Sequence, residues 1–269
     1  MKKLEFHPIV KFMLKKTFLL SIFLYSGFIK CQNIDQFEKE IFISGNDTLN
    51  YRILKPKNYN SNKSYPLHLF LHGAGERGND NQSQLIHGSD LFLKEENREK
   101  FNSWVIFPQC KLGDRWPSFK FDDWNGEPEN NSNNKPNPSL QLVIELMDKF
   151  TKKDQVDQNK IYVSGLSMGG MGTFEILYRR PDMFAAATPI CGNGIEQLAM
   201  VYAKKVPIWI FHGSDDRVVS PNHSLKMAKA LIKYGGSPRL TFYENVGHDS
   251  WNNAFNEKDF LNWIHSKSK

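Results

Sequence analysis

Short apolar segments typical of β-strands alternate along the chain with segments whose apolar residues recur at helical spacing. Residues 37–43 and 48–54 flank the turn Gly45-Asn46-Asp47 and predict a β-hairpin. Further strands are predicted at 65–71, 104–107, 160–163, 184–190, 206–211 and 240–243, and helices at 139–151, 168–180, 221–234 and 250–266. Because strands alternate with helices, the pattern predicts an α/β fold with a mostly parallel central sheet and helices on both faces.

The segment 111–138 carries neither pattern and is rich in Asn, Pro and Gly. A long irregular segment inside a compact domain is either disordered or functional. Its four aromatic residues favour a packed loop; they are Trp116, Phe119, Phe121 and Trp124. No repeat or linker divides the sequence, so residues 32–269 are expected to form a single domain.

Most of the net charge lies near the N-terminus. The 269 residues include 35 Lys and Arg against 29 Asp and Glu, and the formal net charge of +6 would suit a nucleic-acid or membrane partner. Residues 1–31 hold six Lys and one Glu, and therefore carry five of those six units. The remaining 238 residues are close to neutral, so no nucleic-acid partner and no stable membrane partner are expected for them. With 40% hydrophobic and 24% charged residues, the chain does not have a disordered composition.

Residues 1–31 have the pattern of an export signal. Lys15 and Lys16 precede an apolar run at 17–29, which matches the basic and apolar regions of a signal peptide and is too short for a comfortable membrane span. Translation could instead start at Met13. The residues before Cys31 do not form an Ala-x-Ala cleavage site, so two alternatives remain: a lipoprotein acylated at Cys31, and an uncleaved anchor. Export to the periplasm or the extracellular space is the favoured interpretation.

A Gly-x-Ser-x-Gly motif, Gly165-Leu-Ser167-Met-Gly169, lies between a predicted strand and a predicted helix. A reversal from strand to helix within so few residues needs glycine on both sides of the serine, because neighbouring Cβ atoms would collide. The strained turn lifts the hydroxyl clear of the carboxyl edge of the sheet, where a substrate carbonyl can reach it. Ser167 is therefore the candidate nucleophile.

A serine hydroxyl becomes a good nucleophile only when a base accepts its proton and an acid orients that base. On this architecture the residues occur in the order serine, acid, histidine, each on a loop after a strand. His248 follows the strand predicted at 240–243 and is the candidate base. His223 and His265 lie on predicted helices and are expected at the surface.

The candidate acid lies in the loop after strand 206–211, which reads His212-Gly-Ser-Asp215-Asp216. Either Asp215 or Asp216 could face His248. A single loop residue of these types is usually solvated. Three suitable groups in the right order, each after its own strand, point to nucleophilic catalysis.

The oxyanion of a tetrahedral intermediate needs backbone N–H donors that are held in advance. Met168, the residue after the candidate nucleophile, is expected to supply one donor. The loop His72-Gly-Ala-Gly-Glu-Arg-Gly78 allows close backbone approach through its glycines, so the N–H of Ala74 is expected to supply the other. Glu76 and Arg77 in this loop could contact the substrate or pair with each other.

Five motifs together resemble the α/β-hydrolase superfamily: Leu71-His-Gly-Ala-Gly-Glu-Arg-Gly78, Gly165-Leu-Ser-Met-Gly-Gly-Met-Gly172, Pro189-Ile-Cys-Gly192, His212-Gly-Ser-Asp-Asp216 and Gly247-His248. More narrowly, residues 65–265 resemble exported bacterial esterases of the dienelactone-hydrolase-like, predicted-peptidase group, which are related to polyhydroxybutyrate depolymerases and feruloyl esterases. The resemblance implies serine-dependent ester hydrolysis without a metal or cofactor, and it implies that Asp216 is the acid. The Asn-rich stretch 125–137 departs from the family, so no substrate preference is carried over.

The resulting hypothesis is hydrolysis of a carboxylic ester through an acyl-enzyme. Trp116 and Trp124 suggest an aromatic or sugar-linked acyl substrate, such as feruloyl or acetyl esters of polysaccharide, and Trp251 suits either packing or a pocket wall. A serine peptidase of the prolyl-oligopeptidase kind is the alternative, although 238 residues leave no room for a propeller domain. A binding protein derived from this fold would lack a catalytic residue, and all three are present.

The expected fold also bears on Cys110 and Cys191. In the usual strand order of α/β-hydrolases, two other strands separate the strands that precede these residues. Three strand spacings amount to roughly 14 Å, whereas a disulfide needs a Cα separation of roughly 4.4–6.8 Å. Two free and mostly buried thiols are therefore expected.

Overall fold

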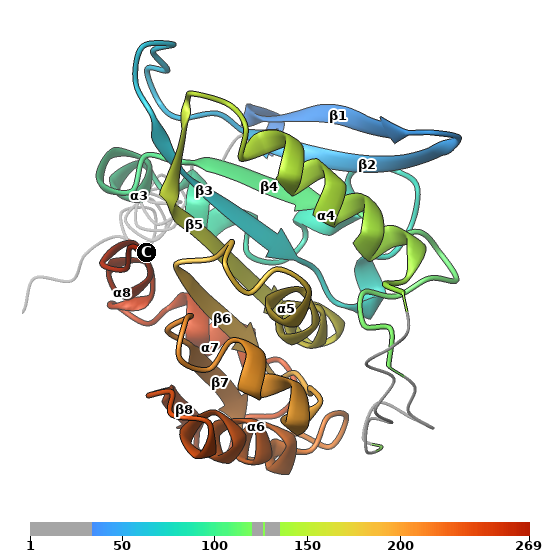
Figure 1. The fold of residues 1–269 in the computed structure, drawn as a ribbon, viewed down its shortest axis with the longest axis vertical. Helices are drawn as coiled ribbons and strands as arrows, with labels where there is room; N and C mark the ends of the chain where they lie inside the picture. The colour runs from blue at the N-terminus through green and yellow to red at the C-terminus, as the bar shows by residue number, and fades with distance from the viewer. Residues whose placement is uncertain (1–33, 120–125, 127–134) are drawn as a thin grey trace, which may run out of the picture. The chain divides into compact units, whose positions relative to one another are not determined.

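The fold is built on one eight-stranded sheet with the order β1-β2-β4-β3-β5-β6-β7-β8 (Figure 1). The computed structural model describes residues 34–119, 126 and 135–269, so the predicted leader lies outside the described residues. The strands are β1 Phe37–Ser44, β2 Asp47–Leu54, β3 Tyr65–Leu71, β4 Trp104–Pro108, β5 Val156–Leu166, β6 Ala186–Ile190, β7 Trp209–Gly213 and β8 Arg239–Tyr243. The β1–β2 hairpin is antiparallel and β2 also runs antiparallel to β4, while the pairs from β4 to β8 are parallel. The predicted mostly parallel sheet is confirmed.

Helices cover both faces of the sheet, as predicted. They are α2 Ser89–Leu93, α3 Glu95–Lys100, α4 Pro138–Phe150, α5 Met168–Arg179, α6 Pro221–Lys233, α7 Trp251–Phe255 and α8 Phe260–His265. The buried faces of α4, α5 and α6 share one apolar cluster, and α2, α7 and α8 contribute to a second. Figure 1 shows α4, α5 and α6 in front of the strands.

Alternation along the strands separates the two apolar clusters. In β3, Leu67 and Leu69 lie in the cluster beneath α4 to α6, whereas Phe70 lies in the opposite one. Trp209 and Ile210 divide in the same way at β7. Because successive side chains of a strand point to opposite faces, a short and wholly apolar strand fills both layers at once.

The single helix predicted over 250–266 is wrong, because the chain breaks between α7 and α8. Phe255 and Phe260 both pack against the same cluster, with ring centroids 5.9 Å apart. In one continuous helix, residues five apart would point about 140° away from each other. The break lets both rings reach the core.

The described aromatic residues of the segment 111–138 are packed, as predicted, although residues 111–113 are exposed. Trp116 and Phe119 are both buried. Phe121 and Trp124 lie outside the described residues.

The cysteine prediction is confirmed for the two cysteines that the structure describes. The strands β3 and β5 separate β4 from β6, and Cys110 and Cys191 are both free and buried. In the described ranges, no helix is both long and apolar enough to cross a membrane.

The turn between β5 and α5 leaves no room for a side chain at its two glycines. A Cβ added at Gly169 would lie 1.9 Å from the carbonyl oxygen of Leu71, at the end of the neighbouring strand β3. A Cβ at Gly165 would lie 2.2 Å from the carbonyl oxygen of Gly169. The contacts are between backbone atoms, so no side-chain movement could relieve them.

Three histidines are held neutral by the fold. Burial lowers the pKa of His68 well below its ordinary value and lowers the pKa of His72 and of His265 to about 4. The ring of His265 lies between those of Phe101 and Tyr162, with both centroid distances 4.9 Å. In the unfolded chain these imidazoles accept a proton near pH 6.5.

Replacing Gly169 by alanine is expected to lower the free energy of unfolding by at least about 3 kcal/mol, because two backbone segments must separate. The matched control is Gly75→Ala. Gly75 is exposed and an added Cβ would meet nothing within 4 Å, so a change within about 0.5 kcal/mol is expected. Urea denaturation measures both, and equal stability of the two variants would contradict the packing described.

The free energy of unfolding is expected to fall as the pH drops from about 6.5 towards 4, because the unfolded chain binds protons that the folded chain excludes. Asp80 and Asp216, whose pKa values are lowered, stabilise the folded chain across this window and lose that contribution only at lower pH. The variant His265→Phe should lose less stability than the wild type between pH 7 and 4.5, by roughly 2–3 kcal/mol. Urea midpoints at the two pH values test this, and an unchanged pH dependence in the variant would count against it.

Candidate active site

Ser167 occupies the strained turn between β5 and α5. Its backbone has φ 53° and ψ −119°, a conformation that residues with a side chain rarely adopt. The N–H of Ser167 donates to the carbonyl of Ile190 at the end of β6, over 2.9 Å. This bond fixes the turn to the neighbouring strand, and the serine hydroxyl is held above the carboxyl edge of the sheet.

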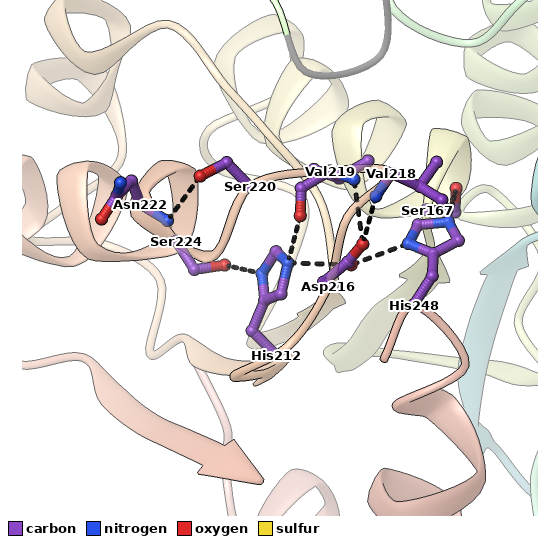
Figure 2. A network of polar contacts seen from close by, with 9 residues as sticks. All are labelled: Ser167, His212, Asp216, Val218, Val219, Ser220, Asn222, Ser224 and His248. Carbon is purple, nitrogen blue, oxygen red and sulfur yellow. Dashed lines mark hydrogen bonds and ion pairs between the residues drawn. The ribbon is translucent and has the colours of Figure 1, made fainter. Parts of the chain in front are cut away.

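Figure 2 shows a continuous chain of hydrogen bonds that begins at this hydroxyl. The distance from Ser167 Oγ to His248 Nε2 is 2.9 Å, and the distance from His248 Nδ1 to Asp216 Oδ2 is 2.7 Å. Because Nδ1 faces a carboxylate, it carries the proton, and Nε2 is left to accept the proton of the hydroxyl. The three residues come from the loops after β5, β7 and β8.

The loops after β7 and β8 approach each other at a glycine. A Cβ at Gly213 would lie 2.3 Å from the carbonyl oxygens of both Val246 and Gly247. The N–H of Asp215 donates to the carbonyl of Val246 over 2.9 Å. This backbone contact brings His248 within reach of Asp216.

The carboxylate of Asp216 is completely buried and fully hydrogen-bonded. Its Oδ1 accepts the N–H groups of Val218 and Val219 at 2.9 and 3.0 Å, and its Oδ2 accepts from His248 and also from His212. Burial alone would raise the pKa of Asp216, but the hydrogen bonds from the two imidazoles and from Val219 outweigh it and hold the pKa well below the usual range. The acid is therefore ionised and acts as a fixed acceptor.

Ser167, His248 and Asp216 differ in how much of their surface is exposed to solvent. The Asp216 side chain has no exposed surface, the His248 side chain is 21% exposed, and Ser167 is 8% exposed. A molecule that approaches from solvent can therefore meet the hydroxyl and the imidazole, while the carboxylate is shielded from water.

The two backbone N–H groups predicted to bind an oxyanion both lie at the start of a helical segment. Met168 is the first residue of α5, and Ala74 is the first residue of the 3-10 helix η2, Ala74–Glu76. The N–H groups at the start of a helical turn have no acceptor within that turn. Both groups are therefore suited to bind an anionic oxygen.

The loop that carries Ala74 is fixed by a buried imidazole. The N–H of Cys110 donates to His72 Nε2 over 2.9 Å, so the proton of the neutral ring is on Nδ1, which donates to the carbonyl of Gly73 over 2.6 Å. Arg77 Nε donates to the carbonyl of Ala74 over 2.8 Å. The loop is thus held from both sides before any substrate arrives.

The choice between the two aspartates is decided by position. Asp215 is exposed, whereas Asp216 is buried against His248. Glu76 and Arg77 do not pair with each other in the described structure. Arg77 bonds to backbone carbonyls, and Glu76 lies 3.7 Å from the imidazole of His87.

Of the three tryptophans predicted to contact the substrate, one is too deeply buried to do so and one lies beside His248. The prediction that Trp116 contacts the substrate is wrong, because this residue is completely buried and its Nε1–H donates to the carbonyl of His72 over 2.9 Å. Trp251 is partly exposed, and its ring lies nearly perpendicular to that of His248 at a centroid distance of 5.5 Å. Trp124 lies outside the described residues.

The structure also adds polar residues that the sequence did not single out. His72 directly follows β3 and His212 is near the end of β7. Each belongs to a His-Gly pair, a signal that could have identified them. His223 was expected at the surface but is only 2% exposed, because α6 packs against β7 and the 3-10 helix η4, Glu196–Val201. His265, also expected at the surface, is partly buried between two aromatic rings.

The ligand atoms of Cys191, Asp216 and His248 lie within 4.8 Å of one another, a spacing that a metal ion could use. Burial raises the pKa of the Cys191 thiol far above its usual value, so the thiol keeps its proton. Asp216 already accepts four hydrogen bonds. These donors suit proton transfer better than metal coordination.

The chain matches the phospholipase/carboxylesterase family over residues 59–265. The solved structure of a thermostable esterase superposes with a TM-score of 0.76 at 32% identity, over 88% of this chain and 64% of that one. The bifunctional acetylxylan esterase/xylanase XynS20E of Neocallimastix patriciarum is 31% identical over 80 residues, 30% of this chain and 12% of that protein. Poly(3-hydroxyalkanoate) depolymerase C of Paucimonas lemoignei is 24% identical over 200 residues, 64% of this chain and 45% of that protein.

These matches cover less than half of the length of the two curated relatives. The family match is broader and includes Ser167, Asp216 and His248. Because it extends over most of the sequence, the chain belongs to the phospholipase/carboxylesterase family.

Proposed function

We propose that this protein is a serine esterase that transfers an acyl group from an ester to water. The observation that carries the proposal is the hydrogen-bond chain from Ser167 through His248 to Asp216 at the carboxyl edge of the sheet. A hydroxyl, a neutral imidazole and an ionised buried carboxylate in this order are the parts that acyl transfer requires. Membership of the family and the 32% identity to a thermostable esterase give it further support.

In the proposed reaction, Ser167 Oγ attacks the carbonyl carbon of the ester while its proton passes to His248 Nε2. The same nitrogen then protonates the departing alcohol, and the acyl-enzyme remains. Water repeats the sequence: it gives a proton to Nε2 and attacks the acyl carbon, and Ser167 leaves with that proton. Asp216 stabilises the imidazolium through Nδ1 in both halves.

The negative oxygen of each tetrahedral intermediate would be bound by the N–H groups of Ala74 and Met168. The former is fixed through His72 and the latter through the tight turn of α5. Donors that are already in place cost no reorganisation when the charge develops.

The proposed substrates are short acyl or feruloyl esters attached to polysaccharide. Two observations support this class: the partly exposed Trp251 ring beside His248, which could stack on an aromatic acyl group or a sugar, and the similarity to a protein named as an acetylxylan esterase. Trp124 is also proposed to contact this substrate.

We further propose that the protein is exported by the segment 1–31, with residues 32–269 as the mature domain. The support is the six lysines and the apolar run at 17–29. Acylation of Cys31 is the alternative form of the same export route.

Ser167→Ala is expected to reduce kcat for p-nitrophenyl acetate on the order of 10⁴- to 10⁶-fold, because it removes the hydroxyl that lies 2.9 Å from His248 Nε2. A fluorophosphonate probe should label the wild type and leave the variant unlabelled. Ser61→Ala is the control, since Ser61 is exposed and distant in sequence from the site. Activity retained in Ser167→Ala would refute the mechanism.

The substrate class is tested on the same protein with p-nitrophenyl esters, feruloyl esters, acetylated xylan and a peptide p-nitroanilide. Hydrolysis of the esters with no peptide cleavage is expected. Faster release from the peptide would instead favour the peptidase alternative.

Expression of the full chain in a bacterium is expected to yield a periplasmic or secreted product, with a mature N-terminus close to residue 32. Cell fractionation followed by intact-mass measurement checks both. A product that keeps residues 1–31 and remains in the cytoplasm would contradict export.

A further inference from the structure

A second imidazole lies behind Asp216, on the side opposite His248 (Figure 2). His212 is near the end of β7 and has no exposed surface. Its Nε2 lies 3.1 Å from Asp216 Oδ2 and 2.9 Å from the carbonyl oxygen of Val219, and its Nδ1 lies 2.7 Å from the hydroxyl of Ser224 on α6. His212 therefore connects the acid to a helix outside the site.

The partners of His212 determine where its proton lies. Nε2 faces two oxygen acceptors, a carboxylate and a carbonyl, so it must carry hydrogen. In the neutral ring Nδ1 then accepts, and Ser224 Oγ, which can act as donor or acceptor, donates to it. The neutral ring thus satisfies every contact in a fully buried place.

His212 supplies one of four hydrogen bonds that surround the carboxylate of Asp216. The two backbone N–H groups of Val218 and Val219 fill Oδ1, and the two imidazoles share Oδ2. A carboxylate offers about four lone-pair directions, so the group is saturated and cannot rotate without breaking a bond. Removing His212 leaves a lone pair of a buried charge unpaired and frees that oxygen to move away from His248 Nδ1.

We propose that His212 is a positioning residue that holds Asp216 Oδ2 at the distance and angle that His248 needs. The inference rests on the proposed esterase function, because its effect is on the turnover of that site. His212 is fully buried and contacts no solvent-facing atom of the site, so it acts on the rate after binding and leaves substrate affinity unchanged.

The fold offers a matched control in His68 on β3. His68 is also completely buried, and its Nε2 lies 2.8 Å from the hydroxyl of Ser164, yet it has no contact with Asp216. Both imidazoles therefore bond to a buried serine from a neighbouring element. Replacing His68 by phenylalanine removes one buried hydrogen bond to a serine. Replacing His212 removes the corresponding bond to Ser224 and also the contacts with Asp216 and Val219, so only this replacement affects the acid.

The test measures kcat and KM for p-nitrophenyl acetate per active site, with the active fraction counted by fluorophosphonate labelling. His212→Phe should lower kcat per labelled site about 10- to 100-fold, with KM changed less than about twofold. His212→Gln, whose amide N–H can reach Asp216, should recover kcat to within about fivefold of the wild type. His68→Phe should stay within about twofold, whatever its effect on stability.

If His212→Phe fails to fold, the pair His212→Gln and His212→Asn decides, because the shorter amide cannot reach Oδ2. Equal kcat per labelled site in that pair, or wild-type kcat in His212→Phe, would overturn the positioning role. Ser167→Ala is assayed alongside. An active Ser167→Ala variant would refute the esterase proposal itself, whereas an inactive one with fully active His212 variants would refute only the inference about His212.

Discussion

The backbone turn at Ser167 is the constraint on which the arrangement of this protein depends. A left-handed conformation at a residue with a side chain costs on the order of 1–3 kcal/mol and persists only where its surroundings hold it. Here two neighbours of the central strand do so: the end of β6 accepts the Ser167 N–H, and the end of β3 lies against Gly169. Relaxing the turn would require the sheet itself to open, and both faces of that sheet are covered by apolar clusters.

Two buried imidazoles stabilise the loops that follow β3 and β7. The strand β3 leads into a His-Gly pair and β7 ends in one, and in each case the buried ring bonds to the loop that follows. An imidazole has one donor and one acceptor, so a single buried ring can satisfy two backbone or side-chain groups at a loop that would otherwise carry unpaired polar atoms. His72 does this for the loop of Ala74, and His212 does it for the loop of Asp216.

The sequence pattern predicted the elements whose structure depends mainly on residues close together in the chain. The hairpin, the strand-to-helix turn at Ser167 and the helix after Pro138 follow from turn residues, periodicity and backbone sterics, and all were predicted. The helix at 250–266 was wrong because helical periodicity continues across a break that only the shared core contact of Phe255 and Phe260 explains. Trp116 was misassigned because a loop aromatic beside a site looks the same in sequence whether its ring faces the substrate or the core.

The sequence by itself predicted the fold class from the alternation of strands and helices. It also predicted the candidate nucleophile and the candidate base, because each lies in a short motif placed after a strand. It left Asp215 and Asp216 as equal candidates until a family resemblance favoured one, since adjacent residues of the same type carry no local difference. The tertiary structure favours Asp216, because its carboxylate is buried against His248 whereas Asp215 is exposed. The contact of His212 with Asp216 is likewise visible only in three dimensions, because the chain after β7 folds back so that Asp216, Val219 and Ser224 all contact the imidazole.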